Sequence, residues 1–308
     1  MPALCSWKEA SMARIGFIGL GNMGGPMARN LVRAGHAVAG FDLAEPARAA
    51  LAEAGGTAAA SLADAVGGAD VVLTMLPEGA HVRAAYQGEN GVLASAREGA
   101  LLVDCSTIDV ETARAVARAA GERGHAMLDA PVSGGVAGAE AGSLTFMVGG
   151  PAAAFEQARP VLERMGRAVI HAGDSGAGQA AKICNNMMLG IQMISVCEAM
   201  ALAGRLGLDR QKLFEISSKA SGQCWSLTSY CPVPGPVPSS PANRDYRPGF
   251  TAAMMRKDLR LAQEAAQAVG ATTPLGAEAY QLYNLFAMQG KEALDFSAII
   301  QMMEEATQ

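Results

Sequence analysis

The chain has few aromatic residues, few cysteines and no run of basic residues. Aromatic side chains make up 5% of the 308 residues and hydrophobic residues 50%, so we expect cores built mainly from Ala, Val, Leu, Ile and Met. The six cysteines form no C-x-x-C pair and no zinc-finger spacing. This pattern favours a reduced compartment, without disulfides and without a bound metal.

Charge and hydropathy exclude further classes. The net charge of −5 without a Lys/Arg cluster argues against binding to nucleic acid or to an anionic membrane surface. Gly, Pro or charged residues interrupt every apolar run before the roughly 18 residues of a membrane span. Residues 1–13 contain Glu9 and no basic amphipathic pattern, so we treat them as a disordered extension rather than a targeting signal. We expect a soluble cytoplasmic protein, or a mitochondrial matrix protein if the source is a eukaryote.

A glycine motif is the most informative feature. Residues 16–31 read GFIGLGNMGGPMARNL, with Gly19, Gly21 and Gly24 spaced as G-x-G-x-x-G between an apolar run and an amphipathic stretch. Such glycines allow a tight turn, close approach to a pyrophosphate and packing of a helix on a strand, and the helix N-terminus attracts the phosphates. A plain glycine-rich turn is the alternative. The motif predicts a dinucleotide bound by Gly19, Leu20, Gly21, Asn22, Met23 and Gly24.

The surroundings of this motif indicate a βαβ unit and NAD. The pattern predicts a buried strand over 14–20, a helix over 27–34 and a second strand over 37–41. Asp42 follows the second strand. A carboxylate about 20 residues past the glycines accepts hydrogen bonds from the ribose hydroxyls and repels a ribose phosphate. Arg48 could attract that phosphate, but Leu43 and Ala44 offer no cation, so NAD is favoured over NADP. A helix cap is the alternative role of Asp42.

Short Val/Ile/Leu runs alternate with helical patterns from Arg14 to about Gly173. This alternation predicts an α/β fold with a Rossmann-type doubly wound sheet, its further strands at 70–75, 101–104, 126–129, 144–148 and 168–171. Ligands bind at the carboxyl ends of such strands. We therefore expect the loops Leu76-Pro77, Ser106-Thr107 and 131–135 to converge on one cleft.

The chain continues as an all-helical C-terminal domain. Helical patterns cover 179–206, 209–219, 252–269, 275–288 and 296–306, with Asp209 and Asp295 as expected N-caps and Gly207, Gly270 and Gly290 as expected ends. Six prolines between 232 and 248 exclude helix and central strand there, leaving an extended loop that covers a cleft or a neighbouring subunit, or a spacer. We place the NAD-binding domain at 14–175 and the helical substrate and oligomerisation domain at 176–308.

The start of the first long helix carries the candidate chemistry. Lys182 and Asn186 lie four residues apart on one face of a strongly apolar helix, where a lysine is costly without a purpose, a snorkelling lysine being the alternative. Desolvation lowers the pKa of a lysine from about 10.4 toward neutrality, so it could exchange a proton with a substrate hydroxyl. The pair fits oxidation of an alcohol by hydride transfer.

Two further segments admit both a functional and a structural role. Ser133, Gly134 and Gly135 offer a hydroxyl and open backbone N–H groups, a suitable seat for a substrate carboxylate or a plain turn. Lys257 and Asp258 lie on a later helix, where a solvated, salt-bridged face explains them equally well.

Motifs along nearly the whole chain resemble the β-hydroxyacid dehydrogenase family, and within it the enzymes that oxidise 3-hydroxyisobutyrate. The resemblance rests on these segments: FIGLGNMGGPMARNL at 17–31, TMLP at 74–77, DCSTID at 104–109, DAPVSGGVAGAEAGSLTFMVGG at 129–150, GAGQAAKICNNM at 176–187, SGQCWS at 221–226, YCPVPG at 230–235 and MRKDLRLAQ at 255–263. Cys105, where many relatives carry serine, is a departure that we expect to change little.

The resemblance implies roles that the residues alone do not. Lys182 would be the catalytic residue and Asn186 its substrate-binding companion, with Ser133, Gly134 and Gly135 as the carboxylate site. The resemblance adds contacts to NAD from these residues: Leu76, Pro77, His81, Thr107 and Lys257. It also places Trp225 and Phe250 beside the methyl group of the substrate, where ordinary packing is their alternative role.

The implied activity is NAD-dependent oxidation of 3-hydroxyisobutyrate to methylmalonate semialdehyde in valine breakdown, by a homodimer or homotetramer. The alternatives are a sibling enzyme acting on tartronate semialdehyde, serine or 4-hydroxybutyrate, and a non-catalytic cofactor-binding scaffold. The presence of Lys182 argues against the scaffold, because relatives with that role have lost the lysine.

Overall fold

The computed structural model describes residues 12–305 and divides into two compact units, Met1–Lys182 and Ile183–Gln308. Residues 1–11 of the predicted disordered extension 1–13 and the predicted helix end at Ala306 lie outside the described residues. The prediction is wrong for Ala13, which is buried and donates its N–H to His36 Nδ1 at 3.3 Å. The division between the units falls inside the first long helix, α9 (Ala177–Arg205).

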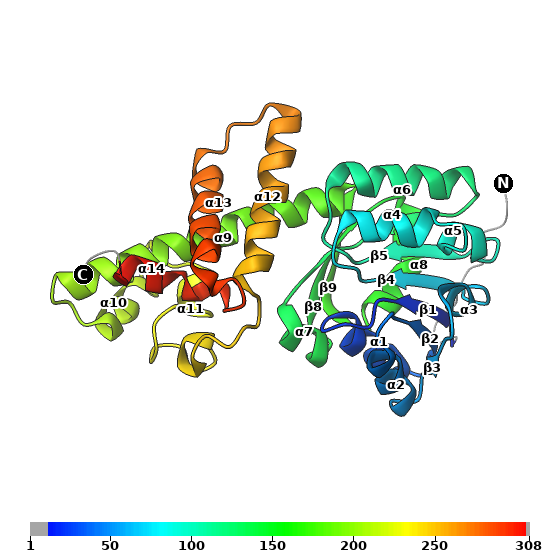
Figure 1. Cartoon of the computed structure of the whole chain (residues 1–308), viewed down its shortest axis with the longest axis horizontal. Helices are drawn as coiled ribbons and strands as arrows, with labels where there is room; N and C mark the ends of the chain where they lie inside the picture. The colour runs from blue at the N-terminus through cyan, green and yellow to red at the C-terminus, as the bar shows by residue number, and fades with distance from the viewer. Residues whose placement is uncertain (1–11, 306–308) are drawn as a thin grey trace. The chain divides into compact units, whose positions relative to one another are not determined.

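Unit 1 is built on a nine-stranded sheet in the order β3-β2-β1-β4-β5-β6-β8-β7, with β9 paired to β8 (Figure 1). The strands are β1 (Arg14–Ile18), β2 (Ala37–Phe41), β3 (Thr57–Ala58), β4 (Val71–Thr74), β5 (Leu101–Asp104), β6 (Met127–Asp129), β7 (Val132–Ser133), β8 (Leu144–Gly149) and β9 (Gly166–Gly173). The first six strands pair in parallel, in the order of dinucleotide-binding folds. The predicted doubly wound sheet is confirmed.

Helices cover both faces of this sheet (Figure 1). They are α1 (Gly24–Arg33), α2 (Glu45–Glu53), α3 (Leu62–Val66), α4 (Gly79–Gln87), α5 (Val92–Ser95), α6 (Val110–Glu122), α7 (Gly135–Ala141) and α8 (Ala152–Leu162). In β4, Val71 and Leu73 join the core that contains α1 and α8, whereas Val72 joins the core that contains α3 to α6. Because both faces are buried, such strands are continuous apolar runs in the sequence.

Three strands differ most from the prediction, and β1 ends at Ile18 rather than at the predicted residue 20. β3 was not predicted because its two residues, Thr57 and Ala58, are exposed and form no apolar run. β7 occupies part of the segment predicted as a loop, where Val132 and Ser133 pair antiparallel with β8. β9 extends beyond the predicted 168–171 at both ends and pairs with β8 in parallel.

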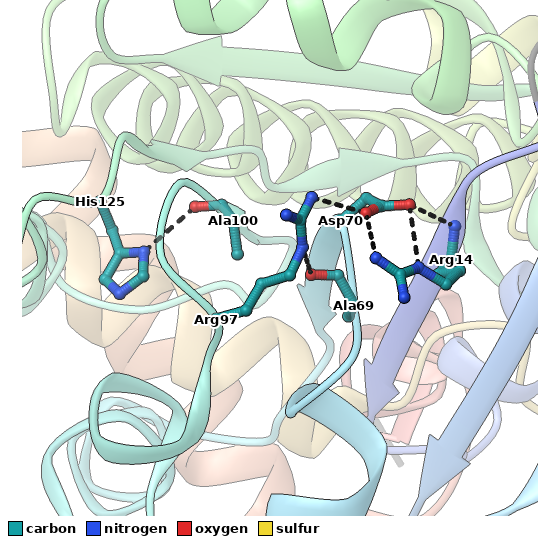
Figure 2. Close-up of polar contacts among 6 residues, drawn as sticks. All are labelled: Arg14, Ala69, Asp70, Arg97, Ala100 and His125. Atoms are coloured by element: carbon teal, nitrogen blue, oxygen red, sulfur yellow. Dashed lines mark hydrogen bonds and ion pairs between the residues drawn. The ribbon is translucent and has the colours of Figure 1, made fainter. Parts of the chain in front are cut away.

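Two arginines bind a buried carboxylate where the amino ends of β1, β4 and β5 meet, here called the amino edge of the sheet (Figure 2). The opposite, carboxyl edge is where these strands end. Asp70 accepts hydrogen bonds from the Arg14 backbone N–H at 2.9 Å and its guanidinium at 3.0 Å, and from Arg97 at 2.6 Å. Burial by itself raises the pKa of Asp70, but the hydrogen bonds and charges of Arg14 and Arg97 outweigh it and lower this pKa below its usual value. On the same edge, His125 Nδ1 lies 3.2 Å from the Ala100 carbonyl oxygen.

Unit 2 is helical, as predicted. Its helices after α9 are α10 (Arg210–Ser217), α11 (Trp225–Thr228), α12 (Ala252–Val269), α13 (Pro274–Phe286) and α14 (Ile300–Glu305), with short turns η1 (Pro241–Arg244), η2 (Ala287–Lys291) and η3 (Phe296–Ile299). The side chains of Asp209 and Asp295 cap α10 and η3, and Gly207, Gly270 and Gly290 adopt positive φ at the predicted helix ends.

The proline-rich segment 231–248 contains one helical turn, η1, which the sequence prediction excluded. Pro241 occupies its first position, where a missing N–H costs nothing, and the Ser240 hydroxyl accepts the Ala242 N–H at 3.4 Å. The rest of the segment is irregular, as predicted.

Among the described residues, α9 alone is long and apolar enough to cross a membrane by length and composition. Core helices of soluble proteins share these properties. In α9, Met193, Cys197 and Met200 lie in the hydrophobic core of unit 2, which accounts for part of its apolar surface.

Candidate functional site

The three glycines of the motif occupy three different environments at the end of β1. Gly19 has φ +90°, and a Cβ there would lie 2.3 Å from the Met75 carbonyl oxygen. A Cβ on Gly24 would lie 1.9 Å from the Gly19 carbonyl oxygen. A Cβ on Gly21 would meet nothing within 4 Å. The fold itself requires glycine at the first and third positions, whereas the open backbone at Gly21 fits approach by a ligand.

Leu20, Asn22 and Met23 lie between these glycines, Leu20 buried, Asn22 exposed and Met23 half-buried at the N-cap of α1. The turn follows β1, and the next parallel strand in the sheet is β4. Strand order reverses here, which is where doubly wound sheets bind dinucleotides.

Asp42 connects the end of β2 to the glycine turn. Its carboxylate accepts the Leu20 N–H at 2.7 Å and the Ala44 N–H at 2.8 Å. The alternative role as a helix cap is wrong, because the N-cap of α2 is Ala44 and no side chain caps that helix. A carboxylate has about four lone-pair sites, so two remain for ribose hydroxyls.

The side chain of Arg48, which could attract the ribose phosphate of NADP, points toward the backbone. Its guanidinium donates to the carbonyl oxygens of Asp42 and Leu43, and it lies 5.9 Å from the centre of the Phe41 ring. These contacts hold its charge beside the Asp42 backbone.

The loops after β4 and β5 are joined by hydrogen bonds. The Leu76 N–H donates to Ser106 Oγ at 2.8 Å, and this hydroxyl donates to Asp104 Oδ1 at 2.6 Å. Burial raises the pKa of Asp104, although hydrogen bonds from Ser106 and Thr74 oppose the shift. The other residues predicted to contact NAD here are the exposed Pro77, the exposed His81 in the first turn of α4 and the half-buried Thr107.

A second buried carboxylate fixes the start of α9. Asp129, at the end of β6, accepts the Gly176 N–H at 2.7 Å and the Gln179 N–H at 2.9 Å. Burial raises its pKa, and these backbone hydrogen bonds oppose the shift. The N-terminus of α9 is therefore anchored to the carboxyl end of β6.

The predicted carboxylate seat is the junction of β7 and α7. Ser133 ends β7 and is half-buried, Gly134 is the N-cap of α7 and Gly135 is its first residue. Both glycines have positive φ, +134° and +62°. Only glycine adopts such angles readily, so the segment is a specified strand-to-helix turn.

Lys182 and Asn186 lie in buried turns of α9, with exposed fractions of 7% and 2%. The Asn186 side-chain amide is held on both sides: its Nδ2 donates to Asp258 Oδ2, and its Oδ1 accepts from Asn185 Nδ2 at 3.0 Å. The Lys257 ammonium lies 4.0 Å from the other Asp258 oxygen. Asp258 is 4% exposed, so the alternative of a solvated face is wrong for this residue.

Trp225 and Phe250 belong to one aromatic cluster in unit 2. Trp225 stacks on Tyr230 with ring centres 5.0 Å apart, Tyr230 stacks on Phe296 at 5.3 Å, and Phe250 meets Phe296 edge-on at 5.7 Å. Trp225 is 49% exposed and Phe250 is half-buried. The two residues predicted to line a substrate pocket thus share a rigid support.

The support is organised by Asp295. This carboxylate is fully buried, and one of its oxygens accepts the Tyr230 hydroxyl at 2.8 Å, the Gly249 N–H at 3.0 Å and the Phe250 N–H at 3.2 Å. Burial and the Asp295 charge raise the pKa of Tyr230 above its usual range. The tyrosine therefore stays a donor to Asp295.

Sequence reasoning did not predict the hydrogen bonds of several polar residues within the two units: Asp104, Ser106, Asp129 and Gln179 in unit 1, and Tyr230, Asp258 and Asp295 in unit 2. The only local signal is a polar residue that closes a buried strand, as at Asp104 and Asp129. Among the described residues, no group of three or more His, Cys, Asp or Glu could hold a metal ion.

The sequence of this chain matches two family models and several known enzymes. Residues 14–173 match the NAD-binding domain of 6-phosphogluconate dehydrogenase, and residues 176–303 match the NAD-binding domain of NADP-dependent 3-hydroxyisobutyrate dehydrogenase. A 3-hydroxyisobutyrate dehydrogenase of Pseudomonas aeruginosa is 54% identical over 94% of this chain and 97% of its own. An NAD-dependent L-serine dehydrogenase of the same organism is 52% identical over 96% of this chain and 99% of its own.

A solved structure of a dehydrogenase is also similar to this chain. The 3-hydroxyisobutyrate dehydrogenase of Mycobacterium tuberculosis, determined with L-serine, aligns with a TM-score of 0.91 at 52% identity, over 95% of this chain and 99% of that one. The prediction of NAD as the cofactor is confirmed. The chain belongs to the β-hydroxyacid dehydrogenase family, in the group of the 3-hydroxyisobutyrate dehydrogenases, and is an NAD-dependent hydroxyacid dehydrogenase.

Proposed function

We propose that the chain oxidises the primary alcohol of 3-hydroxyisobutyrate to methylmalonate semialdehyde. The observation that carries the proposal is the pair of buried polar side chains, Lys182 and Asn186, one turn apart on α9. The names of the relatives and the aromatic cluster around Phe250 support the choice of a substrate with an apolar methyl branch.

In the proposed reaction, the hydroxyl proton of the substrate passes to the Lys182 amine. When bound, NAD accepts the hydride from the carbon that carries the hydroxyl. Asn186 orients the hydroxyl with its second Nδ2 hydrogen, because the first is used by Asp258. Ser133 and the N–H groups of Gly134 and Gly135 receive the carboxylate.

A second candidate is oxidation of L-serine. A relative at 52% identity carries that name, and the M. tuberculosis structure contains L-serine. The two substrates share the carboxylate and the primary alcohol and differ at the central carbon, where one carries a methyl group and the other an ammonium group. An apolar wall of Trp225 and Phe250 would favour the methyl group.

The decisive experiment measures NADH formation from NAD with both enantiomers of 3-hydroxyisobutyrate, L-serine and 4-hydroxybutyrate, and NADH consumption with tartronate semialdehyde, which is already an aldehyde. We expect the highest kcat/KM with one enantiomer of 3-hydroxyisobutyrate. A higher value with L-serine would replace the proposed substrate, and no turnover with any of them would favour a scaffold.

Lys182→Ala tests the proton-transfer role. We expect kcat to fall by at least about a hundredfold, the usual contribution of a general acid or base, while NADH affinity is retained. Lys212→Ala is the control, because Lys212 is an exposed lysine that pairs with Glu215 at 2.9 Å. Near-normal turnover of the Lys182 variant would refute the assignment.

A further inference from the structure

One buried amide connects a predicted cofactor loop to the helix of the predicted catalytic lysine. Gln179, in the first turn of α9, is fully buried. Its Nε2 donates to the Ser106 carbonyl oxygen at 2.7 Å, and its Oε1 accepts the Ile108 N–H at 3.1 Å. These two backbone groups flank Thr107, the residue expected to contact NAD.

We propose that Gln179 is a positioning residue that clamps the Thr107 loop to the turn of α9 that carries Lys182. The inference rests on the proposed function, because it takes the roles of Thr107 and Lys182 from there. In this proposal, Gln179 contacts neither the substrate nor the nicotinamide of NAD. It acts by fixing the distance between the cofactor loop and the lysine.

The chemistry of the clamp requires a neutral amide. The loop presents a carbonyl, which needs a donor, and an N–H, which needs an acceptor, on either side of one residue. A glutamine side chain supplies one of each in a single plane. A carboxylate would place an oxygen against the Ser106 carbonyl, and an apolar side chain would leave both buried groups unpaired.

The clamp is itself fixed at its base. The Gln179 N–H donates to Asp129 Oδ2 at 2.9 Å, so the backbone that carries the amide is tied to the end of β6. Lys182 follows three residues later, a spacing that places both side chains on one side of the helix. A shift of the amide would therefore shift the lysine.

The clamp also reaches the loop after β4. Ser106, whose carbonyl accepts from Gln179, accepts the Leu76 N–H on its hydroxyl at 2.8 Å. Leu76 and Thr107 are both expected to contact NAD. One continuous set of hydrogen bonds within unit 1, buried at Gln179 and part-buried at Leu76, thus links the two loops expected to contact NAD to α9.

Gln179→Leu removes both hydrogen bonds at similar side-chain volume. We expect kcat/KM to fall at least about tenfold and the Kd for NADH to rise several-fold, because misplacement by about 1 Å is costly to catalysis. We also expect faster hydrogen exchange at the Ile108 amide, which reports the clamp directly.

Asn30→Leu is the matched control. The Asn30 amide is buried in the same unit and donates to the Ala139 carbonyl oxygen at 2.7 Å, the same bond length as in the clamp. Its loss should lower thermal stability, with NADH affinity within about twofold of wild type. Equal effects of the two variants on NADH affinity would reduce Gln179 to a structural role and overturn the proposal.

Gln179→Glu adds a pH readout. A protonated glutamic acid can donate to the Ser106 carbonyl while accepting from Ile108, whereas the carboxylate cannot. NADH affinity of the variant, relative to wild type, should therefore recover as the pH falls. A ratio that does not change with pH would overturn the clamp. The affinity measurement needs no substrate, so it remains valid even if the proposed substrate is wrong.

Discussion

At the scale of single residues, buried carboxylates hold this chain together. Asp70 binds two arginines, Asp129 binds the start of α9, Asp258 binds Asn186, and Asp295 binds Tyr230 and the backbone of Phe250. Burial of a charge is unfavourable unless hydrogen bonds replace water, and each of these groups has them. Removing one hydrogen-bond partner of such a carboxylate should therefore strongly lower the free energy of unfolding.

The Asp70→Asn variant should lose stability. An amide cannot pair with the charges of Arg14 and Arg97, and hydrogen bonds to charged groups contribute about 1.5 to 3 kcal/mol. We expect the free energy of unfolding at neutral pH to fall by about that amount, measured by urea titration. Glu156→Gln, which breaks an ion pair between exposed side chains of Glu156 and Arg159, is the control with little expected change.

The same variant has a defined pH dependence. The pKa of Asp70 is lower in the folded state than in the unfolded chain, so its ionised form stabilises the fold above the unfolded pKa. That contribution is lost as the pH falls through the folded pKa. The difference between wild type and variant should therefore be full above about pH 5 and shrink below about pH 4. A difference that persists unchanged in acid would contradict the ion pair as its cause.

Residue roles could be predicted only where a local motif fixes them. Gly19, Gly24 and Asp42 were found by spacing alone, and their contacts fit the predicted turn. The hydrogen bonds of Gln179 and Asp258 were not predicted because their partners lie 71 to 73 residues away in the chain. Periodicity within one helix cannot identify such partners.

At the scale of elements, the turn from β1 to α1 contains two glycines that the fold requires, Gly19 and Gly24, and one, Gly21, with open space around it. Gly24→Ala would place a Cβ 1.9 Å from the Gly19 carbonyl oxygen, so we expect a large loss of thermal stability. Gly21→Ala would meet no protein atom within 4 Å, so we expect a melting temperature near that of wild type.

NADH affinity should distinguish these two variants. The methyl group of Gly21→Ala would occupy the path by which the backbone approaches the pyrophosphate, so we expect the Kd for NADH to rise at least about tenfold in a well-folded protein. Calorimetric titration with NADH measures this change. Wild-type affinity in the Gly21 variant would show that the pyrophosphate does not lie against this turn.

The sequence predicted strands that are buried along their whole length, and it missed short elements that depend on local pairing or on one turn. The strands β4 and β5 are buried throughout and were found as apolar runs. The strand β7 was missed because two residues carry no periodicity, and its existence depends on pairing with β8. The turn η1 was missed because prolines argue against helix in general, although the first position of a turn accepts one.

At the scale of the whole molecule, each unit has its own hydrophobic core, and the two edges of the sheet differ in kind. Two clusters pack on the two faces of the sheet in unit 1, and a third lies in unit 2. The amino edge of the sheet carries the Arg14–Asp70–Arg97 ion pairs (Figure 2). The carboxyl edge carries the glycine turn and the loops joined by Ser106. We therefore predict that the amino edge contributes to stability and that the cofactor binds at the carboxyl edge.

This division predicts where NADH will protect the backbone from hydrogen exchange. At short labelling times, which report local opening rather than global unfolding, we expect slower exchange in peptides covering 19–24, 75–77 and 105–108, at the carboxyl ends of β1, β4 and β5. Peptides covering 96–100 and 123–126, at the amino edge, should exchange as in the free protein. Mass spectrometry with and without NADH measures both sets in one sample. Protection confined to the amino edge would place the cofactor on the wrong side of the sheet, because ligands of doubly wound sheets bind beyond the carboxyl ends of the strands.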